Sequence, residues 1–189
     1  DQITHVVIKS GVTSIGNNAF SSCFYLTDIS MPDTVTRIGR EAIYACLNLT
    51  SLDISRVKTF DAGALCNSGL TEVAIPSGIT ELPGNLLSSC KKLTKVTLPE
   101  GITKIGVTVF GECESLASII LPRTVTSIGS YAFDDTAIRT IDIPNGVTEI
   151  GERAFGQCPN LTELVIPDSV VKIGLNVVEG CSKLRSIYI

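Results

Sequence analysis

Residues 138–160 read IRTIDIPNGVTEIGERAFGQCPN, and residues 161–183 read LTELVIPDSVVKIGLNVVEGCSK. The two stretches align without a gap, and the same pattern of about 23 residues recurs over almost the whole chain. Copies begin at Ile3, Leu26, Leu49, Leu70, Leu93, Leu116, Ile138 and Leu161, with a last partial copy from Leu184. A fixed period of this length indicates a solenoid in which each unit packs against its neighbours. We therefore predict one solenoid domain over 1–189, with eight repeats and a terminal strand.

The beginning of each repeat predicts a short strand. We call a position counted from the first residue of a copy a column. Columns one, four and six hold Leu, Ile, Val or Met in every copy, whereas column three is always polar. Columns four and six thus point inward and column five outward, the period-two pattern of a strand with one buried face. Pro at column seven in six copies ends the strand because it lacks an N–H.

Two further segments complete the repeat. An apolar pair at columns ten and thirteen, such as Val147 and Ile150, predicts a second strand that Gly closes at column fourteen. Ala-Phe-x-x-Cys places Phe155 three residues before Cys158, which is the spacing of a single helical turn. Glycines at column nine suit a backbone with positive φ: Gly11, Gly78, Gly101 and Gly146. We predict an α/β repeat solenoid, a right-handed superhelix with a parallel sheet on one face and second strands and helical turns on the others.

The third repeat departs most from the pattern. Ser55 and Arg56 stand in place of Pro and Gly, and Phe60 and Asp61 in place of Ile and Gly. Two residues are also missing from this copy. We expect a local irregularity of the solenoid over residues 55–69.

The motifs L-x-x-I-x-L-P and I-G-x-x-A-F-x-x-C, nearly complete in residues 138–158 and 161–181, resemble the BspA-like, or treponemal-type, leucine-rich repeats. The resemblance covers residues 3–189. An ordinary leucine-rich repeat has Asn or Cys three residues after the last strand Leu. Here Cys comes instead three residues before the next copy. The resemblance implies a cell-surface or secreted protein that mediates adhesion, including attachment to host extracellular-matrix or plasma proteins.

Composition and charge narrow the range of partners. The net charge is −4, from 15 basic and 19 acidic residues spread over all repeats, so no basic stripe for nucleic acid is present. The chain has no run of about 20 apolar residues, so we expect no membrane insertion. The chain begins at Asp1 without a signal-like segment and stops at Ile189, a buried strand position. We expect a fragment of a longer extracellular protein, monomeric or weakly associated end to end.

The seven cysteines predict structural thiols. Six lie at column twenty-one, namely Cys23, Cys46, Cys90, Cys113, Cys158 and Cys181, and Cys66 lies two positions earlier in its copy. They are strung along the axis without a C-x-x-C pair, which disfavours a metal site. Neighbours such as Cys23 and Cys46 are within disulfide reach. Because Ser68 and Thr136 occupy the same column, we favour free, buried side chains, each donating weakly to a backbone carbonyl.

Catalytic chemistry is not expected. The sole histidine, His5, lies at an outward strand position, where a solvated side chain is the ordinary outcome. Outward carboxylates could act in glycoside hydrolysis only in a pocket that raises one pKa, and a solenoid face without insertions offers none. Threonine columns two and eleven suit a solvated strand surface better than an ice-matching array, because they are interrupted. We expect no enzyme, no metal and no cofactor.

Any binding is expected on the outward columns two, three and five, which vary without affecting the core. The candidate protein-binding face comprises Asp28, Asp53, Glu72, Lys95, Ile120, Arg139, Asp142, Glu163, Val165, Arg185 and Tyr188. Its N-terminal half is acidic, and its C-terminal half mixes apolar and charged side chains, a composition nearer to that of protein interfaces. Two alternatives stay open: these side chains only keep the strand face soluble, or the solenoid is a spacer that displays another domain.

Overall fold

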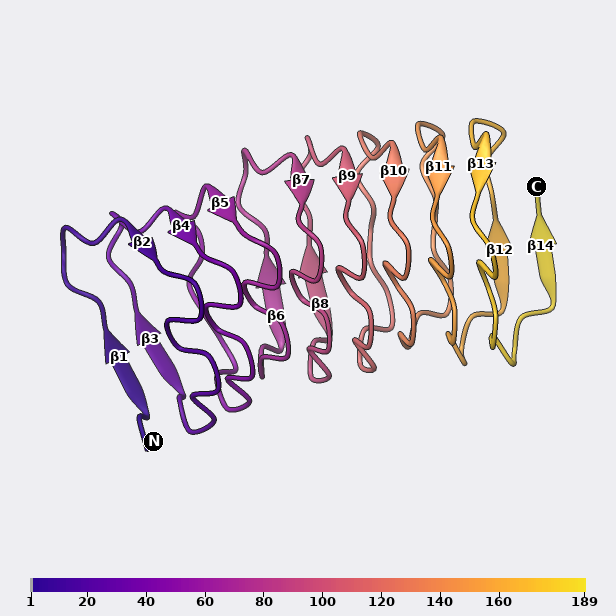
Figure 1. The fold of residues 1–189 in the computed structure, drawn as a ribbon. Helices are drawn as coiled ribbons and strands as arrows, with labels where there is room; N and C mark the ends of the chain where they lie inside the picture. Colours follow the sequence, from indigo (N-terminus) through magenta and orange to yellow (C-terminus); the bar gives the residue numbers. More distant parts are fainter. Residues whose placement is uncertain (1) are drawn as a thin grey trace.

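The computed structural model describes residues 2–189 and forms a stack of coils, one for each repeat (Figure 1). The first strands of the coils are β1 (His5–Val7), β3 (Asp28–Ser30), β6 (Glu72–Ala74), β8 (Lys95–Thr97), β12 (Glu163–Val165) and β14 (Ser186–Tyr188). The second strands are β2 (Ser14–Ile15), β4 (Arg37–Ile38), β5 (Thr59–Phe60), β7 (Glu81–Leu82), β9 (Lys104–Ile105), β10 (Ser127–Ile128), β11 (Glu149–Ile150) and β13 (Lys172–Ile173). Every pairing is parallel and joins equivalent columns, as in Val6 opposite Ile29 and Ile128 opposite Ile150.

The core is a set of columns of like residues along the axis. Columns one, ten and thirteen are fully buried through the middle of the stack, as Leu116, Val125 and Ile128 illustrate. At column eighteen, Phe110, Phe133 and Phe155 stack with ring centroids 5.3 and 5.5 Å apart. The spacing is that of offset aromatic stacking, so identical rings in successive coils reinforce the register.

The predicted helical turn is not confirmed, because the third side of each coil is a run of turns. Among the described residues no helix occurs, so the α component of the predicted α/β class is wrong. Columns sixteen and twenty have positive φ in all eight coils, as at Thr108 (55°) and Glu112 (60°), and a right-handed helix cannot accommodate them. The amides of Thr108, Phe110 and Glu112 instead donate to carbonyls of the next coil at 2.8–2.9 Å. Each coil therefore bonds to its neighbour on its third side as well.

Glycine at column fourteen has a steric cause. A Cβ built on Gly106, Gly129, Gly151 or Gly174 would lie 2.2–2.6 Å from backbone atoms of the preceding coil. No side chain fits at these four positions, because each coil there approaches the preceding one closely. At column nine, positive φ is confirmed for Gly11, Gly78 and Gly101 (95–104°), but Gly146 lies outside the left-handed region.

The pairing of second strands is interrupted between the third and fourth coils, whereas β5 in the third repeat pairs with β4 in register, so the irregularity expected over residues 55–69 stays a prediction. In most coils the amide at column fourteen donates to the preceding coil, as from Asp61 to the Ile38 carbonyl at 3.0 Å. The fourth coil has Pro83 at this column, and Pro has no N–H to donate. The second strands accordingly form one sheet ending at β5 and another beginning at β7, and these strands stand apart in Figure 1.

Cysteine and threonine side chains bond the coils together. The thiols of Cys46, Cys90, Cys113, Cys158 and Cys181 donate to the column-eighteen carbonyl of the preceding coil at 3.0–3.3 Å, so the predicted donor role is confirmed. All seven cysteines are free, as expected, but Cys23, Cys66 and Cys181 are half-buried and not buried. Cys23 and Cys181 lie in the first and last complete coils of the described stack. At column eleven the hydroxyls of Thr103, Thr126 and Thr148 donate to the preceding coil at 3.1–3.2 Å. The threonines therefore have a structural role. The right-handed sense of the superhelix stays a prediction.

Candidate protein-binding face

All eleven residues of the candidate protein-binding face are exposed to solvent. Side chains at columns four and six, such as Val96 and Leu98, face the core, so those at columns three and five must face outward. The strand geometry therefore presents the face as one surface along the stack. Its role in binding stays a prediction.

The acidic half of the face is partly neutralised by neighbours. Glu72 lies opposite Lys95, and their charged atoms are 3.6 Å apart. The Asp53 carboxylate accepts a hydrogen bond of 3.0 Å from the Ser55 amide, and this bond is the main reason that its pKa is lowered. Asp28 lies opposite His5. The third coil has no assigned first strand, so strand pairing on this face is interrupted between β3 and β6.

In the C-terminal half of the face, the coils between β8 and β12 are not paired along their first strands. No first strand is assigned over residues 118–120 or 140–142, although the second strands β9, β10 and β11 stay paired in the same coils. Open grooves of about 340, 720 and 440 Å³ lie at the three successive junctions of coils five to eight. The face is therefore hollowed here.

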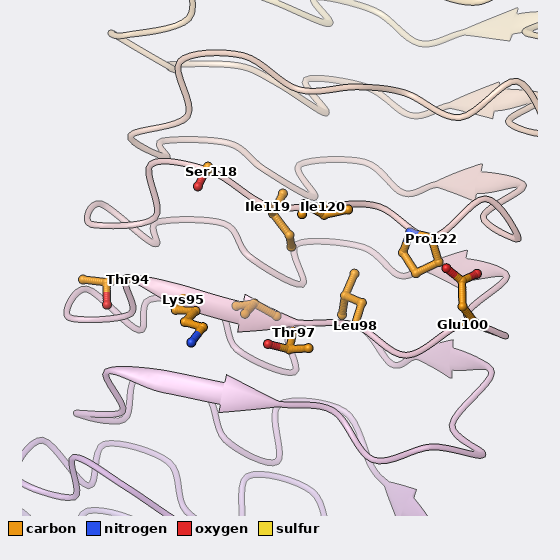
Figure 2. Close-up of a pocket in the computed structure, with 10 residues that line it drawn as sticks. Thr94, Lys95, Thr97, Leu98, Glu100, Ser118, Ile119, Ile120 and Pro122 are labelled. Atoms are coloured by element: carbon orange, nitrogen blue, oxygen red, sulfur yellow. The ribbon is translucent and has the colours of Figure 1, made fainter.

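The first groove runs between residues 94–98 and 118–122 (Figure 2). Ile119 projects between the two coils, with Thr94 and Ser118 toward one end and Glu100 and Pro122 toward the other. Ile120 lines both this groove and the next, and 88% of its surface is exposed. An apolar centre with polar side chains at its ends is the arrangement expected of a protein-binding surface.

Other predicted residues meet at the remaining grooves. Asp142, Glu163 and Val165 line the last of the three, and Val165 lies opposite Tyr188 in the β12–β14 pair. The face also includes residues that the sequence argument missed: Glu100, Arg123 and Asn145. All three occupy column eight, directly after the strand-ending Pro. The variability of that column was the signal that could have identified them.

In the part of the chain that the structure describes, side chains that could bind a metal do not converge on one point. Within residues 2–189, no three His, Cys, Asp or Glu side chains gather in a metal-binding arrangement. His5 Nδ1 lies 2.9 Å from the Thr4 hydroxyl on the exposed face. No helix of the described residues is long and apolar enough to cross a bilayer.

Parallel strands joined through equivalent columns, over a core of repeated Leu, Ile and Val, define a leucine-rich-repeat solenoid. The chain belongs to the BspA type leucine rich repeat family, whose model matches residues 1–116 and 80–189 with six copies. The prediction of this family is confirmed. A comparison with functionally curated proteins finds no match.

Several solved structures are similar to this chain. A leucine-rich repeat protein from Bacteroides ovatus is 28% identical (TM-score 0.77), with 98% of this chain and 55% of that protein covered. A leucine rich cell surface protein from Faecalibacterium prausnitzii is 30% identical (TM-score 0.72), with 99% and 61% covered. A leucine rich repeat protein from T. pallidum is 26% identical (TM-score 0.63), with 98% and 79% covered. The chain thus spans little more than half of the first two proteins.

Proposed function

We propose that this chain is part of a non-enzymatic, cell-surface or secreted protein whose candidate protein-binding face attaches to another protein. Its family membership and its similarity to a leucine rich cell surface protein support this proposal. The partner class is a host extracellular-matrix or plasma protein, or a protein on another microbe. The hollowed part of the face, over coils five to eight, is the contact region.

The exposure of Ile120 carries the proposal. Other copies have Ser30, Asp53 and Thr97 at the same column, so coil packing does not require an isoleucine there. Leaving a large aliphatic side chain in water forgoes about 1.5–3 kcal/mol of burial free energy. A partner that covers Ile120 would recover this energy, and the charged groups of Lys95 and Asp142 beside it would form a polar rim.

A structural spacer is the alternative function. Hydrogen bonds on the third side join coil to coil, including across the irregular junction of the third and fourth coils, where the Gly63 amide donates to the Gly84 carbonyl. A stack bonded in this way is suited to holding another domain away from a surface. The two functions differ in whether the strand face itself binds anything.

Binding of the purified chain to immobilised extracellular-matrix and plasma proteins tests the proposal. Ile120→Asp introduces the residue that Asp53 and Asp142 supply at the same column, and it should weaken binding about 10-fold or more, as expected at a hot spot. Charge reversal at Arg139 and Arg185 should also alter binding, whereas Lys104→Glu on β9 should not. If neither Ile120→Asp nor the charge reversals change the affinity, the strand face is not the binding surface. If the unaltered chain binds none of these proteins, the spacer function is favoured.

A further inference from the structure

A second set of exposed apolar side chains lies outside the columns of the candidate protein-binding face. Phe24, Tyr25, Tyr44 and Leu47 belong to the first two coils, at columns twenty-two, twenty-three, nineteen and twenty-two. Their surfaces are 49%, 56%, 36% and 43% exposed. We call this set the aromatic corner, because columns twenty-two and twenty-three form the turn that leads into the next first strand.

The fold does not require these side chains. At columns twenty-two and twenty-three the other copies have small or polar residues, including Ser182 and Asn160, and column nineteen is Ser in two copies. The same columns are exposed inside the stack, as at Lys91 and Glu114, so the exposure of Phe24 does not come from its place in the first coil. The chain has only ten Phe and Tyr residues, and three of them are exposed in these two coils.

The backbone beneath the aromatic corner is well bonded. The Asn48 side-chain amide donates to the Phe24 carbonyl at 2.8 Å, and the Ser22 amide donates to the Tyr44 carbonyl at 2.7 Å. The Phe24 amide donates to the Ser22 carbonyl at 2.9 Å. These bonds hold both coils at this turn, so the rings are presented in advance of binding, which lowers the entropy cost of capturing a ligand.

Size and charge indicate the kind of ligand. Taking about 200 Å² for each fully exposed side chain, the four residues leave on the order of 370 Å² of accessible surface. A stable protein interface covers about 800 Å² on each partner, so this patch is too small to hold a protein alone. The four side chains carry no charge, and the Lys92 ammonium beside Leu47 donates to the Leu47 carbonyl at 3.2 Å. An uncharged ligand smaller than a protein therefore fits best.

We propose that the aromatic corner binds a neutral carbohydrate, with the apolar C–H face of a sugar ring against the aromatic rings. The hydroxyls of Tyr25 and Tyr44 can donate and accept hydrogen bonds at the ring edge, and the Asn48 side-chain oxygen can accept one. Large flat side chains with a few convergent polar groups are typical of small-ligand sites. The site lies on different columns from the candidate protein-binding face, so it is independent of the function proposed above.

Titration with neutral hexasaccharides of glucose, galactose, mannose and N-acetylglucosamine, followed by saturation-transfer NMR and calorimetry, tests this site. The triple variant Phe24→Ser, Tyr25→Asn, Tyr44→Ser uses only residues that the chain itself has at those columns, so the coils should fold unchanged. We expect at least one sugar to bind, each ring deletion to weaken binding roughly 3- to 10-fold, and the triple variant to lose it. Val171→Ser, which removes an exposed apolar side chain outside both this site and the candidate protein-binding face, should bind as the unaltered chain does.

Two results would overturn the proposal. In the first, none of the four hexasaccharides binds. In the second, binding survives in the triple variant. If the triple variant loses attachment to a deglycosylated protein while no sugar binds the unaltered chain, the aromatic corner belongs to a protein interface.

Discussion

Replacement of Gly129 by alanine should separate the fifth and sixth coils. The added Cβ would lie 2.6 Å from the carbonyl carbon and oxygen of Gly106 and 2.8 Å from the Val107 amide nitrogen. These are backbone atoms, so no side-chain rotation relieves the overlap. Ordinary van der Waals contact begins near 3.4 Å, so the coils would have to part by about 0.8 Å.

The expected loss follows from the bonds at that junction. The Gly129 amide donates to the Ile105 carbonyl at 2.8 Å, and the Thr126 amide donates to the Thr103 carbonyl at 2.8 Å. A shift of about 0.8 Å takes both beyond hydrogen-bond distance. Each bond contributes about 1 kcal/mol, and overpacking costs a further 1–3 kcal/mol, although partial relaxation offsets some of both. We expect Gly129→Ala to lower the free energy of unfolding by about 2–4 kcal/mol.

Gly16 provides a matched control, because it occupies the same column of the first coil. A Cβ on Gly16 meets no atom within 4 Å, so Gly16→Ala should change stability by less than about 0.5 kcal/mol. Urea unfolding followed by circular dichroism measures both variants, and amide exchange at residue 129 reports whether the loss is local. Equal stability of the two variants would refute the steric reasoning.

Two further outcomes are expected. Thr126→Val removes the hydroxyl that donates to the Thr103 carbonyl at 3.1 Å and should cost about 0.5–1.5 kcal/mol in urea unfolding; a variant as stable as the parent would show that the hydroxyl adds nothing. The neighbouring Cys158 thiol favours the Cys181 thiolate and so lowers the pKa of the half-buried Cys181 thiol, whereas burial raises the pKa of Cys113 well above its ordinary value. Since the thiolate is the nucleophile, iodoacetamide should label Cys181 first, with a rate that rises with pH, while Cys113 stays unlabelled in the folded chain. Cys158→Ala should raise the pKa of Cys181 and slow its labelling at pH 7, and mass spectrometry of the labelled peptides would expose the opposite order.

Much of the fold could be predicted from the sequence, because solenoid columns repeat the same environment. Leu, Ile and Val at columns one, four and six require the same buried place in each coil, and the β12–β14 register follows from them. The helical turn could not be predicted correctly, because a Phe three residues before Cys fits a helix and a run of turns equally well. The deciding information is the backbone conformation at residues such as Asn18 and Arg153, where side-chain identity does not reveal positive φ.

The candidate site was harder to predict than the core. Alternation along the strands identifies outward side chains such as Ile120, but not the parting of the coils that forms the grooves, since this depends on hydrogen bonds between repeats. The sequence did not lead to the aromatic corner, because only columns two, three and five were expected to vary freely. Phe24 and Tyr25 are the only adjacent aromatic residues in the chain, and that pair was the available signal.

The junction at Pro83 has a mechanical consequence. Between the third and fourth coils, which the structure describes completely, neither first-strand nor second-strand pairing is formed, and bonds such as Leu65 N–H to the Leu86 carbonyl hold the third side. The Thr71 amide also donates to the Thr50 carbonyl at 3.1 Å, so this junction keeps one backbone bond at the start of the first-strand side but lacks the strand pairing of its neighbours. Tension along the stack should therefore open this junction before those with paired strands, and the first three coils would separate from the remaining five.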